Sequence, residues 1–203
     1  MDFRRMSIDE FLEPLGSSSP TPGGGTVSAL SGALAAGLTK MVASLTQGKK
    51  GYEDHFPLMQ ETALLETQEI EWFKTMMDED SKAFNQVTRA MKLPKDTPTQ
   101  KEVRAEAIQA ALKAATKTPL EIAKHITRLV PRAGLMARFG NKNAKSDALC
   151  ALELCQAGFR MSLENVSINL EMIKDSQFVQ KTREAVSELK TQFEEGMKQA
   201  LEA

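Results

Sequence analysis

The sequence of 203 residues has few of the side chains that build disulfide frameworks, metal centres or aromatic cores. It contains two cysteines, two histidines, one tryptophan and one tyrosine, and aromatic residues make up 5%. Cys150 and Cys155 are five positions apart on an apparent helix, where their side chains do not meet, so neither a disulfide nor a zinc framework is indicated. His55 and His125 show no metal-ligand spacing, and we predict no metal site. A reduced, cytoplasmic setting is the simplest interpretation.

The chain also lacks an excess of charge of either sign. With 26 basic and 27 acidic residues the net charge is −1, which argues against a nucleic-acid partner bound by a general basic surface. The N-terminus carries acids and lacks a continuous apolar stretch, so a signal peptide is not predicted. Residues 26–46 are long enough to span a membrane, but Ser, Thr and Lys40 interrupt them, and we predict no membrane association.

No run of alternating apolar and polar residues is long enough to predict a sheet. Helix caps, first-turn prolines and terminal glycines are instead frequent, and the apolar residues favour helices. They predict helices over the ranges 7–14, 26–47, 57–91, 98–116, 119–138, 146–173 and 176 to the C-terminus. Long helices joined by short loops predict an all-α fold, a single-domain bundle of mostly antiparallel helices over residues 1–203.

Three glycines, Gly23, Gly24 and Gly25, stand between two prolines and a helix of small residues. Such a backbone lets a ligand or another helix approach closely. The free N–H groups at a helix start favour the binding of an anion or a carbonyl oxygen. The stretch lacks the Lys-Ser/Thr pair of a phosphate-binding loop, and no strand precedes it, so nucleotide binding is not supported. The small residues of the helix itself predict a tight helix crossing, within the subunit or with a second subunit.

Three acids, Asp78-Glu79-Asp80, lie in the middle of a predicted helix, where Asp is unfavourable. Asp80 shares a partly apolar helix face with Met77 and Phe84. An acid on such a face resists ionisation and is a candidate proton donor or acceptor. The alternative is a solvated acidic turn at the surface, and the pattern alone does not separate the two.

Two polar clusters follow predicted helix ends. Lys49 and Lys50 either stabilise the negative end of a helix or hold a carboxylate-bearing ligand. The segment Gly-Asn-Lys-Asn-Ala-Lys-Ser-Asp at 140–147 gathers polar groups on one short loop. Ser146 or Asn143 as an N-cap is a sufficient structural reason for it, and ligand binding is the alternative.

Asn165 and Asn169 are four positions apart on a mostly apolar helix face. Buried amides need hydrogen-bond partners. The partners are either neighbouring helix groups or the amide edge of a ligand.

Taken in order, these motifs resemble one family. The segments PTPGGG, GKKGYED, DEDSKAF, LPKDTP, GNKNAKSDA and NVSINL are similar to those of the cyclodeaminase domain, the C-terminal domain of formiminotransferase-cyclodeaminase. Stand-alone bacterial relatives include methenyltetrahydrofolate cyclohydrolases. The resemblance covers nearly the whole chain. The formiminotransferase part is absent from this sequence, so only the second activity is expected.

The resemblance implies an all-helical homodimer that binds a tetrahydrofolate derivative as substrate, with or without a polyglutamate tail, and no tightly bound cofactor. The cyclodeaminase converts 5-formiminotetrahydrofolate to 5,10-methenyltetrahydrofolate and releases ammonia. The cyclohydrolase interconverts the methenyl form and 10-formyltetrahydrofolate with water. We place cyclodeaminase first and cyclohydrolase second. A third interpretation is a non-catalytic helical dimerisation or scaffold protein.

The resemblance also implies roles for individual residues. Asp80 is the predicted general acid and base, and Asp78 is a weaker candidate. Lys49 is the second predicted catalytic residue, and Lys49 and Lys50 are expected near the reacting carbon or on the glutamate tail. The substrate-binding residues are expected to include Gly23, Gly24, Gly25, Lys50, Asn141, Ser146, Asp147, Asn165 and Asn169. The enzyme interpretation predicts that Asp80, Lys49 and Asn141 line one cleft, formed by one subunit or by two, whereas the scaffold interpretation predicts that they are scattered.

Overall fold

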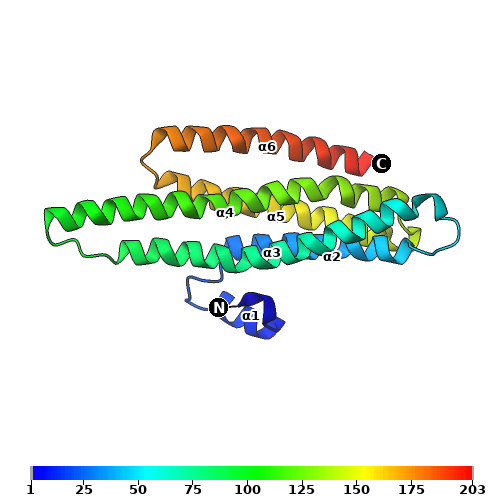
Figure 1. Cartoon of the computed structure of the whole chain (residues 1–203), viewed down its shortest axis with the longest axis horizontal. Coiled ribbons are helices and arrows are strands. Elements are labelled where there is room, and N and C mark those ends of the chain that lie inside the picture. The colour runs from blue at the N-terminus through cyan, green and yellow to red at the C-terminus, as the bar shows by residue number, and fades with distance from the viewer. Residues whose placement is uncertain (1, 203) are drawn as a thin grey trace.

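All secondary structure in the described residues, 2–202 of this computed structural model, is helical (Figure 1). The elements are η1 (Phe3–Arg5), α1 (Ile8–Leu15), α2 (Gly24–Thr46), η2 (Glu53–His55), α3 (Phe56–Met91), α4 (Pro98–Phe139), η3 (Lys142–Ala144), α5 (Lys145–Glu171) and α6 (Ser176–Glu202). The predicted all-α fold is confirmed.

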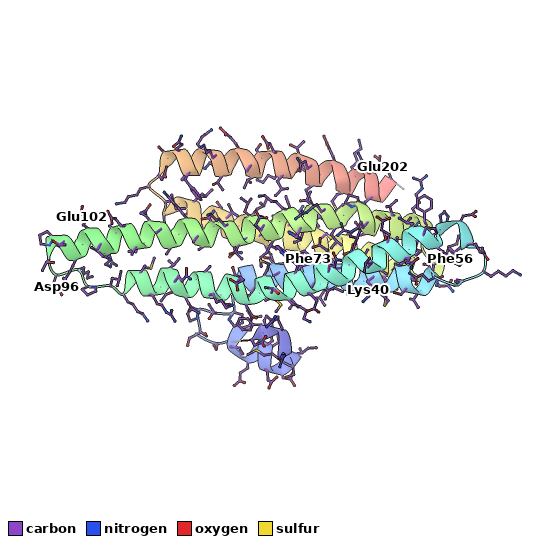
Figure 2. All side chains as sticks on the ribbon, viewed as in Figure 1. Lys40, Phe56, Phe73, Asp96, Glu102 and Glu202 are labelled. Carbon is purple, nitrogen blue, oxygen red and sulfur yellow. The ribbon has the colours of Figure 1, made fainter. Side chains whose placement is uncertain are left out.

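Helices α2, α3, α4 and α5 form a four-helix bundle in which α2 packs against the other three. Helix α6 covers α4, while α1 lies on the opposite side of the bundle and η1 contacts α3 (Figure 1). The predicted small-residue crossing is found within the subunit. Gly32 faces the ring of Phe73, which Figure 2 shows inside the bundle, and Gly158 faces Ile126 and Ser31. A Cβ at Gly32 would come within 2.5 Å of that ring, so glycine sets the spacing between α2 and α3.

One helix prediction is wrong. The segments 98–116 and 119–138 form the single helix α4, with Pro119 and Pro131 inside it. A proline removes one backbone hydrogen bond and costs about 3 kcal/mol in a helix interior. The neighbouring α3 and α5 pack against α4 and Pro119 is buried, so packing outweighs that local preference.

Helix α2 is apolar and long enough to cross a membrane by length and composition, with a mean hydropathy of 1.3 in its most apolar window. In the bundle, 61% of that window is buried. This is the burial expected of a core helix, and the apolar character of α2 is accounted for largely by its three helical neighbours.

The N-terminal segment is attached to α3 through Asp78. The backbone N–H of Phe3 donates to Asp78 Oδ1 at 2.9 Å, and Arg4 Nε lies 3.2 Å from Asp78 Oδ2. Phe3 itself is buried against the ring of Phe11. Both carboxylate oxygens of Asp78 are therefore engaged in a structural contact.

Candidate active site

A pocket lies where the start of α2 meets α3, α4 and α5. Its volume is about 290 Å³. The lining residues come mainly from the loop before α2, from the second half of α3 and from the last turns of α5. They are Pro20, Thr21, Gly23, Gly24, Gly25, Asp80, Phe84, Val87, Thr88, Met91, Ala115, Asn165, Ile168, Asn169 and Met172. Six of the predicted site residues, from three segments distant in sequence, therefore meet in one cavity.

Asp80 is the one ionisable group among these lining residues. Its Oδ2 accepts a hydrogen bond of 2.9 Å from the hydroxyl of Thr26, in the first turn of α2. Burial raises the pKa of Asp80 above its ordinary value of 3.8, and hydrogen bonds from the side chain and backbone of Thr26 oppose this. Thr26 was not among the predicted residues. Its place three positions after the N-cap Gly23 is the signal that could have found it, because first-turn groups face an anion at a helix start.

The glycine triplet allows two polar side chains to touch the helix backbone. A Cβ on Gly25 would overlap the carboxylate of Asp80, and one on Gly24 would lie 3.2 Å from Asn165 Nδ2. The positive end of the α2 dipole therefore lies directly against the acid. Glycine is needed here for space, since neither Gly24 nor Gly25 has positive φ.

The remaining walls of the pocket are mostly apolar. Phe84, Met91, Ile168 and Met172 line it and are each 41–54% exposed. The side-chain amide of Asn165 donates to the carbonyl of Met161 at 2.8 Å, which fixes it at the pocket wall. An apolar cavity with an acid, two amides and backbone N–H groups at one end matches the usual design of a small-molecule site.

The other predicted residues gather at the opposite end of α2. Lys49 Nζ donates to Asn141 Oδ1 at 2.7 Å, and that oxygen also accepts the backbone N–H of Asn143 at 3.1 Å. The Asn141 backbone N–H donates to Thr46 Oγ1 at 2.8 Å. Asn141 is buried and Lys49 is half-buried, so this second cluster is a defined structure.

Three further predicted residues belong to the same end of the bundle. Lys50 and Ser146 are exposed, and Asp147 is half-buried in the first turn of α5. The prediction that Ser146 or Asn143 caps this helix is wrong. Ala144 holds the N-cap position without a side-chain bond, and the side chain of Asn141 caps the preceding η3 instead.

The predicted cleft common to Asp80, Lys49 and Asn141 is not formed within one subunit. Asp80 lies at the first turn of α2, while Lys49 follows its last turn. A helix of this length separates its two ends by roughly 30 Å. Lys49, Lys50, Asn141, Ser146 and Asp147 therefore lie outside the pocket that contains Asp80.

A buried ionic cluster between α3 and α4 was not anticipated. Arg132 Nε binds Oε1 of the fully buried Glu66, and Arg132 Nη2 lies 3.6 Å from Glu69 Oε1. Glu69 Oε2 lies 2.7 Å from Nδ1 of His125, whose ring stacks on Trp72. Burial raises the pKa of Glu66 to about 7, against the opposing effect of Arg132. The cluster joins residues far apart in sequence, so no local motif marks it.

Comparisons with known proteins identify the family of this chain. A family model described as formiminotransferase-cyclodeaminase matches residues 7–188. The chain belongs to this family. It is 40% identical over 177 residues to a methenyltetrahydrofolate cyclohydrolase of Methylorubrum extorquens, covering 86% of this chain and 84% of that protein.

Other members of the family are longer. The chain is 33% identical over 189 residues to the formimidoyltransferase-cyclodeaminase of Gallus gallus, and the match covers 93% of this chain but 35% of that protein.

A solved structure of formiminotetrahydrofolate cyclodeaminase from Thermotoga maritima superposes with a TM-score of 0.86 at 34% identity, over 97% of this chain and 94% of that one. The family fold therefore spans nearly all of this chain.

Proposed function

We propose that this chain is a tetrahydrofolate one-carbon enzyme and that it converts 5-formiminotetrahydrofolate to 5,10-methenyltetrahydrofolate and ammonia. The observation that carries the proposal is the position of Asp80. Its carboxylate lies in a largely apolar pocket, against the first turn of a helix, with a raised pKa. An acid in that setting is suited to accept and to deliver a proton during the reaction.

The chemistry proceeds through a tetrahedral carbon bonded to N5, N10 and the amine. N10 attacks the formimino carbon and loses its proton, and the amine gains a proton and leaves as ammonia. Asp80 accepts the first proton and delivers the second. Once ionised, it stabilises the cationic N5–C–N10 unit of the product. Thr26 orients the carboxylate throughout, because its hydroxyl hydrogen bond holds Oδ2.

The pocket is small for the whole substrate. Pockets for small molecules usually begin at roughly 300 Å³. This one, at about 290 Å³, lies at that lower limit. We assign the pterin ring and the reacting carbon to the pocket. We assign binding of the amino-pyrimidine edge of the ring to the amides of Asn165 and Asn169, which line the pocket. The glutamate tail, with or without further glutamates, then extends beyond this subunit's pocket.

A second candidate is methenyltetrahydrofolate cyclohydrolase activity, in which water replaces the amine. It is favoured by the 40% identity to a protein of that name over 84% of that protein's length. The same two proton transfers at the same carbon are required, so Asp80 has the same role in both reactions.

The proposal includes the remaining expectations from the sequence. The folate is a substrate, no cofactor is tightly bound, the enzyme is a homodimer, and it acts in the cytoplasm without a nucleic-acid or membrane partner. Its rival is a helical scaffold protein without catalytic activity.

A paired absorbance assay tests the proposal. The protein is mixed with 5-formiminotetrahydrofolate in one cuvette and with 5,10-methenyltetrahydrofolate in another, and the methenyl chromophore is followed. Appearance of the chromophore in the first identifies a cyclodeaminase, and faster loss in the second alone identifies a cyclohydrolase. No change in either cuvette with folded protein would contradict both and favour the scaffold.

A further inference from the structure

Two buried hydroxyl groups form a chain that ends on the carboxylate of Asp80. Thr26 Oγ1 lies 2.9 Å from Asp80 Oδ2, to which it donates, and 3.2 Å from Ser81 Oγ. Thr26 and Ser81 are both buried, and neither lines the pocket. The chain therefore reaches the acid from inside the bundle, while Asp80 itself lines the pocket.

Ser81 differs from several other buried hydroxyl residues of the long helices. Thr39, Thr46 and Thr116 each donate to the carbonyl four residues earlier in their own helix, which is the usual bond of a hydroxyl inside a helix. Ser81 makes no such bond among the described residues, and its side chain pairs with Thr26 of α2. Because a buried hydroxyl without a partner is costly, this contact fixes the position of the Ser81 side chain.

The direction of the chain follows from the number of protons. A hydroxyl group carries one proton and two acceptor lone pairs. The proton of Thr26 is directed at the carboxylate, so at its other contact Thr26 accepts and Ser81 donates. Ser81 thus donates to Thr26, and Thr26 donates to Asp80. Each bond of such a chain polarises the next one and strengthens it.

The chain holds one of the two carboxylate oxygens of Asp80. Oδ2 accepts the bond from Thr26, whereas Oδ1 accepts no side-chain hydrogen bond from the described residues. Oδ1 is also not among the sealed polar atoms that lack a partner there, so it is accessible from the pocket. A proton on Oδ2 would force both hydroxyls to turn around, since Thr26 would have to accept it and donate to Ser81. A proton on Oδ1 leaves both hydroxyls in place.

We propose that Ser81 and Thr26 are positioning residues, which hold Asp80 Oδ2 through a one-way hydrogen-bond chain and so assign the proton transfers to Oδ1. The inference rests on the proposed function. When N10 forms its bond to the formimino carbon, its proton moves to Oδ1. When the carbon–amine bond breaks, its electron pair goes to the amine, which takes the proton from Oδ1 and leaves as ammonia.

Charged groups around Asp80 are few, which makes its pKa a sensitive measure of the chain. It is the one ionisable side chain among the pocket-lining residues of α2, α3, α4 and α5. Its neighbours Asp78 and Glu79 on α3 are each paired with a cation. Burial raises the pKa of Asp80 and the hydrogen bonds from Thr26 lower it. Loss of either hydroxyl is therefore expected to raise that pKa.

Carbon-13 NMR of labelled aspartate carboxyl groups tests the chain without reference to activity. The Asp80 signal is the one missing from Asp80→Asn. Thr26→Val should raise its titration midpoint by about 1–2 pH units, the size expected for a lost hydrogen bond to a charged group, and Thr26→Ser should keep the wild-type midpoint. Thr39→Val removes a buried hydroxyl about 20 Å further along α2 and should leave the midpoint unchanged. An unchanged midpoint in Thr26→Val would overturn the proposal.

Ser81→Ala decides whether the two hydroxyls act as a chain. Because the Ser81 hydroxyl bonds Thr26 and not Asp80, its loss should raise the Asp80 midpoint by about 0.2–0.5 pH unit through Thr26 alone. In a Thr26→Val background the same substitution should have no effect, since the link is already missing. No shift in Ser81→Ala, or equal shifts in both backgrounds, would show that no chain exists.

The assignment of Oδ1 is tested by a crystal structure at atomic resolution, at a pH below the Asp80 midpoint. The carbon–oxygen bond that carries the proton is the longer one, so we expect Cγ–Oδ1 to be longer than Cγ–Oδ2. Equal bonds, or a longer Cγ–Oδ2 bond, would contradict the assignment.

Kinetics test the consequence for the reaction. Thr26→Val should lower kcat by about 10–100-fold with KM little changed, because the carboxylate is present but no longer held in place. The low-pH limb of its rate profile should move to higher pH with the NMR midpoint, since the base acts when ionised. Wild-type kcat in Thr26→Val would remove the positioning role. If the wild type is inactive on folates, the proposed function fails, while the NMR midpoints and bond lengths still decide the chain.

Discussion

Two acids of helix α3, Glu66 and Asp80, lie about four turns apart in different surroundings. Glu66 is fully buried against Arg132 in the middle of the bundle, and one of its oxygens, Oε2, has no hydrogen-bond partner among the described residues. Asp80 lies on a pocket, against the start of α2, with a hydroxyl as its partner. Burial raises the pKa of both acids. A raised pKa therefore does not identify a catalytic acid by itself, and access to a ligand distinguishes Asp80 from Glu66.

The largest effect on activity, without a loss of stability, is expected from Asp80→Asn. The variant should lose about 10²–10⁴-fold in kcat, the usual contribution of general acid–base catalysis. Its thermal stability should be equal to or above that of the wild type, because the substitution removes a carboxylate that burial disfavours. The absorbance assay and a melting curve measure the two effects. Undiminished activity would remove Asp80 from the mechanism, and a large loss of stability would make it a structural acid like Glu66.

Arg132→Met is expected to have the opposite effect, a loss of stability with little change in kcat. It leaves Glu66 buried without its cation, which should cost about 3–5 kcal/mol of unfolding free energy at pH 8. The loss should shrink at pH 5, where Glu66 can bind a proton, and kcat of the remaining folded enzyme should hardly change. Urea denaturation at both pH values measures it. The double variant Glu66→Gln/Arg132→Met is the control and should recover most of the loss, because it removes the fully buried carboxylate together with its cation.

The pH dependence of the unfolding free energy measures the contribution of Glu66. Its pKa in the folded protein is about 7, compared with an ordinary value of 4.5, so the folded state binds the proton more tightly. Wild-type stability should therefore fall as pH rises from the ordinary pKa through the folded one, by about 3 kcal/mol from this group. Glu66→Gln should flatten that part of the stability–pH curve. Parallel curves for the two proteins would show that Glu66 titrates normally.

The next comparison is between two glycines, one with no room for a side chain and one with room. Gly25→Ala forces a methyl group into the Asp80 carboxylate and should destabilise the protein by about 1–3 kcal/mol while lowering kcat. Gly196→Ala, in α6, meets only Val130 Cγ1 at 3.6 Å. It should stabilise the protein by about 0.5–1 kcal/mol through its effect on helix formation. Thermal unfolding of both variants checks this pair. Equal effects would mean that the carboxylate moves aside without cost.

The smallest effect is expected at Asp78, two positions from Asp80. Asp78→Ala removes the contacts to Phe3 and Arg4, of which the Arg4 side chain is 43% exposed, so the ion pair is screened. The substitution should cost about 1 kcal/mol. Hydrogen exchange should increase in residues 2–15, with kcat unchanged. A loss of kcat comparable to that of Asp80→Asn would give Asp78 a catalytic role as well.

Several features could be predicted from the sequence because their causes are local. Capping boxes at Ser7 and Thr97 set the starts of α1 and α4, and both are present in the structure. Asp80 and the glycine triplet marked the pocket, because a helix start and an acid on an apolar face are each recognisable from short segments. The boundary at Pro119 was wrong because contacts with α3 and α5, which are distant in sequence, outweigh a local break.

The sequence by itself determined the helices, the all-α class and the chemistry available at each motif, since these depend on residues within a few turns of one another. Only the tertiary structure decided which motifs meet. The packing of α2 against α3 brings Gly25 to Asp80 and carries Lys49 to the other end of the bundle. It also paired Glu66 with Arg132, which no local pattern links. Contacts between distant segments depend on which faces pack together, and that is a property of the whole chain.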